Sequence, residues 1–193
     1  MGPWPPERRV MINVNSWSST LLLPFTRFRR NRDGSVAVEF SIVVLPFLAL
    51  TWAILELGLV FFAGQALETG VENASRLIKT GQAQQAGYDE AAFKSAICEY
   101  AEAFLDCAGK LHVDVRTAST FDDIDLSKPI SNGVLDTSGF GYEPGGSGSI
   151  VIVRAFYEWP TFGRLLGLDL SSTANNKHLL IAVDAFRNEP FPW

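Results

Sequence analysis

Two histidines and one glycine-rich stretch are the first places where this chain of 193 residues could carry out chemistry. His112 alternates with apolar residues at the start of one predicted strand and His178 begins another, so both are interpreted as surface or sheet residues. The stretch Gly145-Gly-Ser-Gly148 lacks the lysine that follows the glycines of a phosphate-binding loop. It also has Ser149 where a hydrolase nucleophile elbow needs glycine. We therefore predict no catalytic residue.

Three nearby acids, Asp122, Asp123 and Asp125, resemble the opening of a calcium-binding loop. The position that such a loop reserves for glycine holds Lys128, and no glutamate closes the loop. We interpret the acids as solvated and predict no metal site and no cofactor. An enzyme of the cell envelope is the least favoured function, because an acid, a base and a nucleophile are missing.

The two cysteines, Cys98 and Cys107, are expected to form a disulfide if this part of the chain is exported. A continuous helix would separate them by about 13 Å and put them on opposite faces. A disulfide needs Cα atoms within about 7 Å of each other. Either the helix ends near Phe104 and the chain turns back, or the pair is not bridged. Two cysteines without a matching pair of Cys or His do not predict a metal site.

A long apolar run from Phe40 to Ala63 contains one charged residue, Glu56. About 20 apolar residues span the hydrocarbon core of a bilayer as a helix. Since soluble helices are rarely apolar on every face, we predict one transmembrane helix, with a buried core helix as the alternative. Glu39 lies near one end, within reach of water or a partner. Glu56 lies about 25 Å further along; it is either an interfacial acid that snorkels or a contact between subunits.

Composition and charge narrow the class of protein and set the expected topology. Fourteen Phe and five Trp exclude a wholly disordered chain, and a net charge of −5 argues against a soluble nucleic-acid binder. Residues 1–34 carry six arginines and two acids, a net charge of +4, whereas the remainder carries −9. The positive-inside rule places this leader in the cytoplasm and residues after about 64 outside it. A cleaved secretory signal fits poorly, because the apolar run is too long.

Hydrophobic periodicity predicts an α+β fold after the apolar run. Helical spacing continues to about residue 80, which would extend the membrane helix as a stalk ending at Gly81. A second helix is expected from Asp89, a good N-cap, to about Phe104. Strand patterns occur at 111–116, 149–159 and 178–186, and a long loop is expected from Thr120 to Gly148.

These segments predict three parts: a basic cytoplasmic leader (1–34), a transmembrane helix with its stalk (35–81), and a periplasmic α+β domain (82–193). In the last part, a helix would pack on a small antiparallel sheet.

The junction between the leader and the apolar helix, Asp33-Gly-Ser-Val-Ala-Val-Glu-Phe40, resembles a type IV prepilin cleavage site. Such sites have a basic leader ending in glycine and an apolar helix with glutamate fifth, where Glu39 stands if Ser35 is first. The chain is more specifically similar to the TadE-like family, minor pilin-like components of the tight adherence (Flp-type) pilus apparatus of bacteria. Further motifs that carry this resemblance are Leu45-Pro-Phe47, Glu56-Leu-Gly58, Gln65-Ala-Leu-Glu68, Ile150–Pro160 and Phe186–Phe191.

The resemblance implies a role in assembly. Gly34 would precede the cut made by a prepilin peptidase, Ser35 would become the new N-terminus, and Glu39 would contact a neighbouring subunit. Uncut anchoring in the membrane is the alternative, and either Met1 or Met11 could start the chain. The family implies a single-pass protein of the bacterial inner membrane, with other pilus-assembly subunits as partners and no nucleic acid.

A function from a different class is a binding module anchored in the envelope and unrelated to pili. Its candidate face is the loop 120–148, where Phe121, Phe140 and Tyr142 are expected to be exposed among acids.

Overall fold

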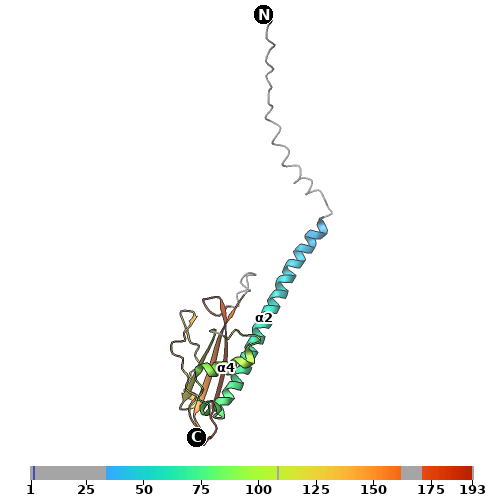
Figure 1. The fold of residues 1–193 in the computed structure, drawn as a ribbon. Helices are drawn as coiled ribbons and strands as arrows, with labels where there is room; N and C mark the ends of the chain where they lie inside the picture. Colours follow the sequence, from blue (N-terminus) through green and yellow to red (C-terminus); the bar gives the residue numbers. More distant parts are fainter. Residues whose placement is uncertain (1, 3–33, 108, 162–170, 193) are drawn as a thin grey trace. The chain divides into compact units, whose positions relative to one another are not determined.

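The computed structural model describes residues 2, 34–107, 109–161 and 171–192 (Figure 1). The leader, with both candidate starts Met1 and Met11, lies outside the described residues except for Gly2 and Gly34. The described chain divides into two compact units, residues 1–48 and 49–193.

The long helix α2 (Ser35–Lys79) confirms the continuous helix predicted from residue 36 to about 80. Its buried residues lie at helical spacing, with neighbours three, four or seven positions apart, so they line one face: Glu56, Ala63, Leu67, Gly70, Val71, Ala74, Ser75 and Ile78. Beyond α2, Gly81 adopts a left-handed φ of 79°, which only glycine reaches without strain. The part that was expected to form a stalk is packed into the core of the second unit, because this apolar stripe needs burial.

A one-turn helix, α3 (Gln82–Gln85), leads into α4 (Glu90–Ala101). Asp89 is the N-cap of α4, and its carboxylate accepts a hydrogen bond from the backbone N–H of Ala92 at 2.8 Å. The helix ends at Ala101, earlier than Phe104, and the chain turns back there. This turn brings the Cα atoms of Cys98 and Cys107 to 6.1 Å, and the two residues form a disulfide.

Three antiparallel strands form the main sheet in the order β1 (Leu111–Ala118), β4 (Ile150–Pro160) and β5 (Lys177–Arg187). The three predicted strands are confirmed. β1 ends two residues later than predicted, β5 gains one residue at each end, and β4 begins and ends one residue later. The register pairs Leu111 with Tyr157 and Ala118 with Ile150. On the other side of β4, Tyr157 pairs with Leu180.

The segment between β1 and β4 has more structure than the predicted loop. It contains a short 3-10 helix η2 (Phe121–Asp123) and a hairpin of β2 (Ile130–Ser131) and β3 (Val134–Leu135). Asn132 and Gly133 form the hairpin turn with φ of 52° and 77°. An Asn-Gly pair is a strong hairpin signal, so this turn could have been predicted from the sequence.

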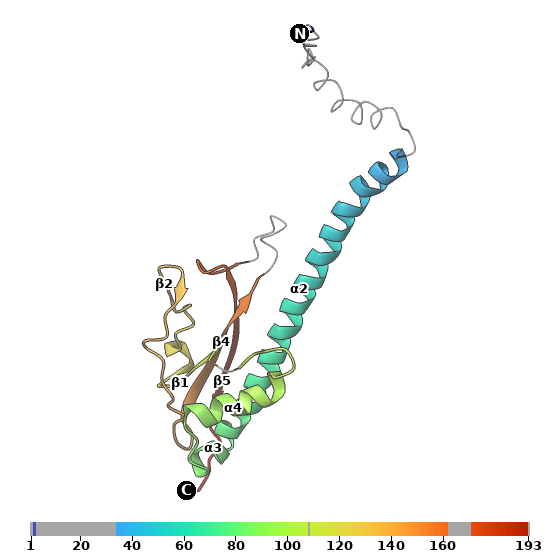
Figure 2. The same ribbon diagram turned by 45° about the horizontal axis from the view of Figure 1, so that its top comes forward.

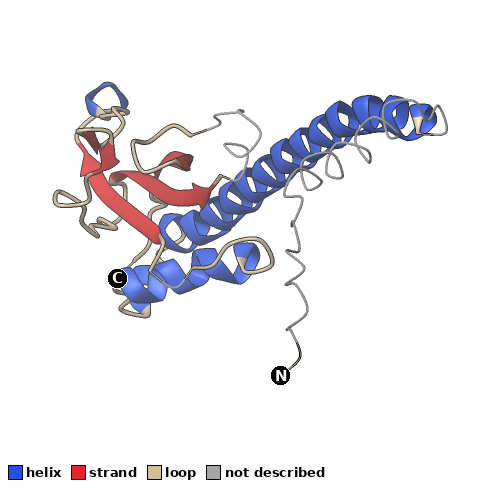
Figure 3. Ribbon diagram, turned by 90° about the horizontal axis from the view of Figure 1, so that it is seen from above, coloured by secondary structure: helices blue, strands red, loops and turns tan. Residues whose placement is uncertain are grey.

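The core lies between one face of the sheet and the two helices α2 and α4, which the views agree in placing on the same side of the strands (Figures 2 and 3). α2 and α4 approach closely at Gly70, since a Cβ there would lie 2.6 Å from the carbonyl oxygen of Ile97. The opposite face of the sheet carries Asp114, Arg154 and Phe156, which hold the segment that contains η2, β2 and β3.

Candidate functional site

The start of α2 presents an exposed carboxylate. The carbonyl of Gly34 accepts the hydrogen bond of Val38 N–H at 3.1 Å, so the helix begins directly after the predicted cleavage point. The hydroxyl of Ser35 donates to Oε1 of Glu39 at 3.0 Å. Gly34, Ser35 and Glu39 are all exposed. The geometry therefore leaves the peptide bond and the carboxylate accessible to another protein.

The N-terminal part of α2 exposes apolar side chains on all sides. Water-exposed patches of this extent are rare in soluble proteins and mark a membrane or protein interface. The exposed residues are Val36, Val38, Phe40, Ile42, Val43, Leu45, Phe47, Leu48, Leu50, Trp52, Ile54, Leu55, Leu57, Leu59, Phe61 and Phe62.

Among the described residues, α2 alone is long and apolar enough to cross a membrane, with a mean hydropathy of 2.2 over its most apolar window. Only 6% of that window is buried. A helix in the core of a soluble protein would instead be buried along most of its length, so the exposure favours the predicted transmembrane helix over the buried core helix.

Glu56 is 5% exposed, on the side of α2 that faces the sheet. Next to it lies a hollow with a volume of about 580 Å³. Trp159, near the end of β4, lines this hollow together with Trp52 and Phe62 of α2. The remaining lining comes from Ile54, Leu55, Gly58 and Leu59. Glu56 is the only titratable group in this lining.

A second candidate region is centred on the buried carboxylate of Asp114, which is 0% exposed. Its Oδ2 accepts hydrogen bonds from Nη2 and Nε of Arg154 at 2.6 and 3.2 Å. Its Oδ1 accepts from Nε of Arg116 at 2.9 Å and from the backbone N–H of Gly141 at 3.0 Å. This carboxylate therefore ties two strands to the segment that follows β3.

Arg154 extends the same network to the segment before β2. Its Nη1 donates to the carbonyls of Asp125 and Ser127 at 3.0 and 3.3 Å, and the guanidinium lies 5.9 Å from the ring centre of Phe156. A polar hollow of about 290 Å³ adjoins these groups, also lined by Arg116. Both guanidinium groups bind Asp114, so this arrangement ties the segment between β1 and β4 to the sheet and stabilises the fold.

The aromatic face expected on the loop 120–148 is only partly present. Phe121 is exposed, but Phe140 stacks on Phe156 with ring centres 5.2 Å apart. The prediction is wrong for Tyr142, which packs on Phe93 at 5.5 Å and forms a bridge with Val115. Burial raises the pKa of Tyr142 to about 12.

The family model of TadE-like proteins matches residues 34–76. This segment is TadE-like. The match confirms the resemblance found in the sequence and includes Gly34, Ser35, Glu39 and Glu56. No curated protein and no solved structure gives a significant match to the chain.

The TadE-like segment thus holds four of the residues singled out in the sequence, all of them on α2 or directly before it. The structure places Gly34, Ser35 and Glu39 together at the exposed start of the helix. Glu56 lies in the second unit, beside the hollow. The disulfide of Cys98 and Cys107 lies outside the TadE-like segment and fixes the end of α4.

The remaining candidates from the sequence do not assemble into a site. His112 lies on β1, where burial and then Lys94 lower its pKa, and His178 lies on β5. Asp122 and Asp123 are exposed. Within the described ranges, no group of three or more His, Cys, Asp or Glu could hold a metal ion.

Two features outside the TadE-like segment were missed from the sequence. The strand pattern predicts Trp159 only as part of a strand, although tryptophan at the end of a strand can signal an interface. Asp114 and Arg154 are charged residues in the middle of strands, which signals that each needs a partner, but only the strand register shows that they pair with each other.

Proposed function

We propose that this protein is a minor pilin-like component of a tight adherence (Flp, type IVb-like) pilus assembly apparatus, anchored in the bacterial inner membrane. The observation that carries the proposal is the TadE-like match over residues 34–76. The exposed apolar surface of α2 supports it, since such a surface needs a membrane or other apolar helices. The protein acts in assembly and does not catalyse a reaction.

The proposed topology has the leader in the cytoplasm and the α+β domain in the periplasm. The six arginines of residues 1–34 support this orientation. A disulfide between Cys98 and Cys107 is consistent with an oxidising compartment on the side of the domain.

Glu39 is proposed to contact another pilus-assembly subunit. A carboxylate within the first turns of a membrane helix costs free energy unless it is paired. A free N-terminal amine on an adjacent helix would offset that cost, and a prepilin peptidase that cuts between Gly34 and Ser35 would create such an amine. Ser35 already donates one hydrogen bond to Glu39, which leaves the second carboxylate oxygen for the partner.

Piliation of the native bacterium tests the proposed function. A strain without the gene should lack pili in electron micrographs, and the wild-type gene should restore them. The variant Glu39→Gln should restore them poorly, whereas the matched variant Glu72→Gln, which changes an exposed acid of the same helix, should restore them fully. Normal piliation of the deletion strain would contradict the proposal and favour the envelope binding module.

N-terminal sequencing of the mature protein tests the processing step. Cells with a prepilin peptidase should yield a chain that begins at Ser35, and cells without it should retain the leader. A mature chain that begins at Met1 or Met11 in peptidase-positive cells would show that the protein is anchored uncut.

A further inference from the structure

The exposed apolar run of α2 is longer than a bilayer requires. It extends from Val36 to Phe62, whereas about 20 helical residues cross the hydrocarbon core. The excess is about two helical turns. If the hydrocarbon begins near Val36, the apolar residues around Gly58 to Phe62 lie at or beyond its outer boundary and need another apolar cover.

The sheet brings Trp159 close to these extra apolar turns of α2. A Cβ on Gly64 would lie 4.0 Å from a methyl group of Leu180, and Leu180 pairs with Tyr157. Trp159 is two residues further along β4, about 7 Å beyond Tyr157. It therefore reaches the turns of α2 that precede Gly64, where it lines the hollow with Leu59 and Phe62.

From this placement we propose that the Trp159 end of the sheet is seated in the outer headgroup layer of the membrane, with lipid chains entering the hollow beside Glu56. This inference rests on the membrane anchor in the proposed function. The domain is then docked on the bilayer surface and does not stand away from it on a stalk.

The chemistry of the end of the sheet fits a lipid surface. Trp52 and Trp159 face the same hollow, and tryptophan prefers the interface between hydrocarbon and water. Except for Glu56, the side chains that line the hollow are apolar or aromatic, which suits the acyl chains of lipids. Glu158 and Lys177, the charged pair next to Trp159, neutralise each other at 2.6 Å. Docking should therefore depend weakly on salt and occur on neutral phosphatidylcholine.

Tryptophan quenching by brominated lipids tests the docking on the full chain. Three variants are reconstituted in phosphatidylcholine vesicles whose acyl chains carry bromine near the headgroup. The first keeps Trp159 as its only tryptophan, and the second keeps Trp52. The third carries Phe121→Trp as its only tryptophan. Phe121 follows the end of β1 that pairs with Ile150, so it lies about 30 Å from Trp159 along the sheet.

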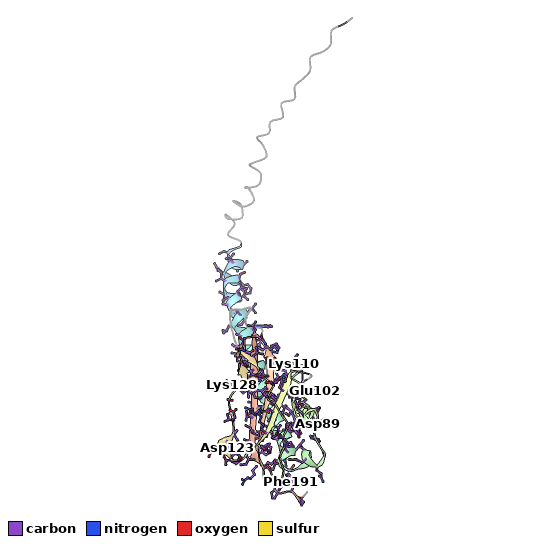
Figure 4. All side chains as sticks on the ribbon, turned by 90° about the vertical axis from the view of Figure 1, so that its left-hand side faces the viewer. Asp89, Glu102, Lys110, Asp123, Lys128 and Phe191 are labelled. Carbon is purple, nitrogen blue, oxygen red and sulfur yellow. A yellow bond between two sulfur atoms is a disulfide. The ribbon has the colours of Figure 1, made fainter. Side chains whose placement is uncertain are left out.

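The far end of the domain is a suitable control site because the two ends are well separated. Figure 4 shows Asp123, which belongs to the same short helix as Phe121, and Lys110, which directly precedes β1, at opposite ends of the domain. A tryptophan at position 121 should remain in water, and its fluorescence should escape quenching by the lipid, even when the domain is docked.

We expect Trp159 to be quenched at least about twofold more than the probe at position 121, with Trp52 quenched as well. Quenching of Trp52 without quenching of Trp159 would overturn the docking and leave the membrane anchor intact. If neither residue is quenched, both the docking and the anchor are wrong.

A second measurement uses the wild-type protein and needs no replacement of tryptophan residues. A photoactivatable phosphatidylcholine should label the wild-type peptide that contains Trp159 and should not label the peptide that contains Phe121. Equal labelling of both peptides, or labelling of neither, would overturn the docking. A cross-link from Trp159 to a second protein chain in place of lipid would do the same.

Discussion

Removal of the Asp114 carboxylate should destabilise the domain more than any exposed substitution, because it leaves a buried guanidinium without its counter-ion. In the variant Asp114→Ala, Arg154 stays 6% exposed but loses two hydrogen bonds at 2.6 and 3.2 Å. Breaking a buried ion pair by removal of one partner costs about 3–5 kcal/mol. Arg154 keeps its bonds to the carbonyls of Asp125 and Ser127, so we expect the lower end, about 3 kcal/mol.

Two matched variants isolate the contribution of the buried pair. Arg116→Ala removes the other ion pair of the same carboxylate, but its side chain is 45% exposed, so the expected loss is at most about 1 kcal/mol. The double variant Asp114→Ala with Arg154→Met replaces the pair by apolar groups and should recover most of the stability.

The assay is urea unfolding of the full chain in detergent micelles, followed by tryptophan fluorescence with the disulfide intact. The difference in the free energy of unfolding is read from the shift of the midpoint at constant slope. A loss for Asp114→Ala no larger than that for Arg116→Ala would refute the reasoning, as would a double variant less stable than the single one.

Four further substitutions have expected outcomes in the same unfolding assay. Gly70→Ala should destabilise the domain by about 1–3 kcal/mol, because its Cβ would meet the Ile97 carbonyl at 2.6 Å. Gly64→Ala, whose Cβ would have its nearest atom at 4.0 Å, should stabilise it by up to about 1 kcal/mol. Changes in the free energy of unfolding with the same sign for both variants would contradict the packing. Cys98→Ser should cost about 2–3 kcal/mol, and reduction of the wild-type disulfide should cost the same. The raised pKa of about 12 keeps Tyr142 neutral in the folded state while the unfolded state begins to ionise near pH 10. Stability should therefore fall as the pH rises above 10. Tyr142→Phe should lessen that alkaline loss, and an unchanged profile would show that the pKa of Tyr142 is not raised in the folded state.

The parts of the fold that could be predicted are those set by local periodicity. The apolar spacing along α2, the Asp89 N-cap and the alternation around Val113 each depend on residues within a few positions of one another. The junction at Glu39 could be predicted for the same reason, since its motif is continuous in the sequence.

The parts that could not be predicted depend on strand register. Asp114 and Arg154 are 40 positions apart and meet only because β1 and β4 pair in one particular register. The position of Trp159 beside Glu56 likewise requires the packing of β4 against α2. The prediction that Tyr142 is exposed was wrong, because the composition of a loop indicates only the average exposure of its residues. It does not predict the burial of a single aromatic side chain.

Thiol labelling of cells tests most directly the claim that the apolar run of α2 crosses the inner membrane and places the domain outside the cytoplasm. The variant Ser147→Cys carries a thiol on an exposed turn of the domain. In spheroplasts, a maleimide that cannot cross membranes should label this cysteine fully, and lysis should add no further label. Labelling that appears only after lysis would place the domain in the cytoplasm and contradict the account.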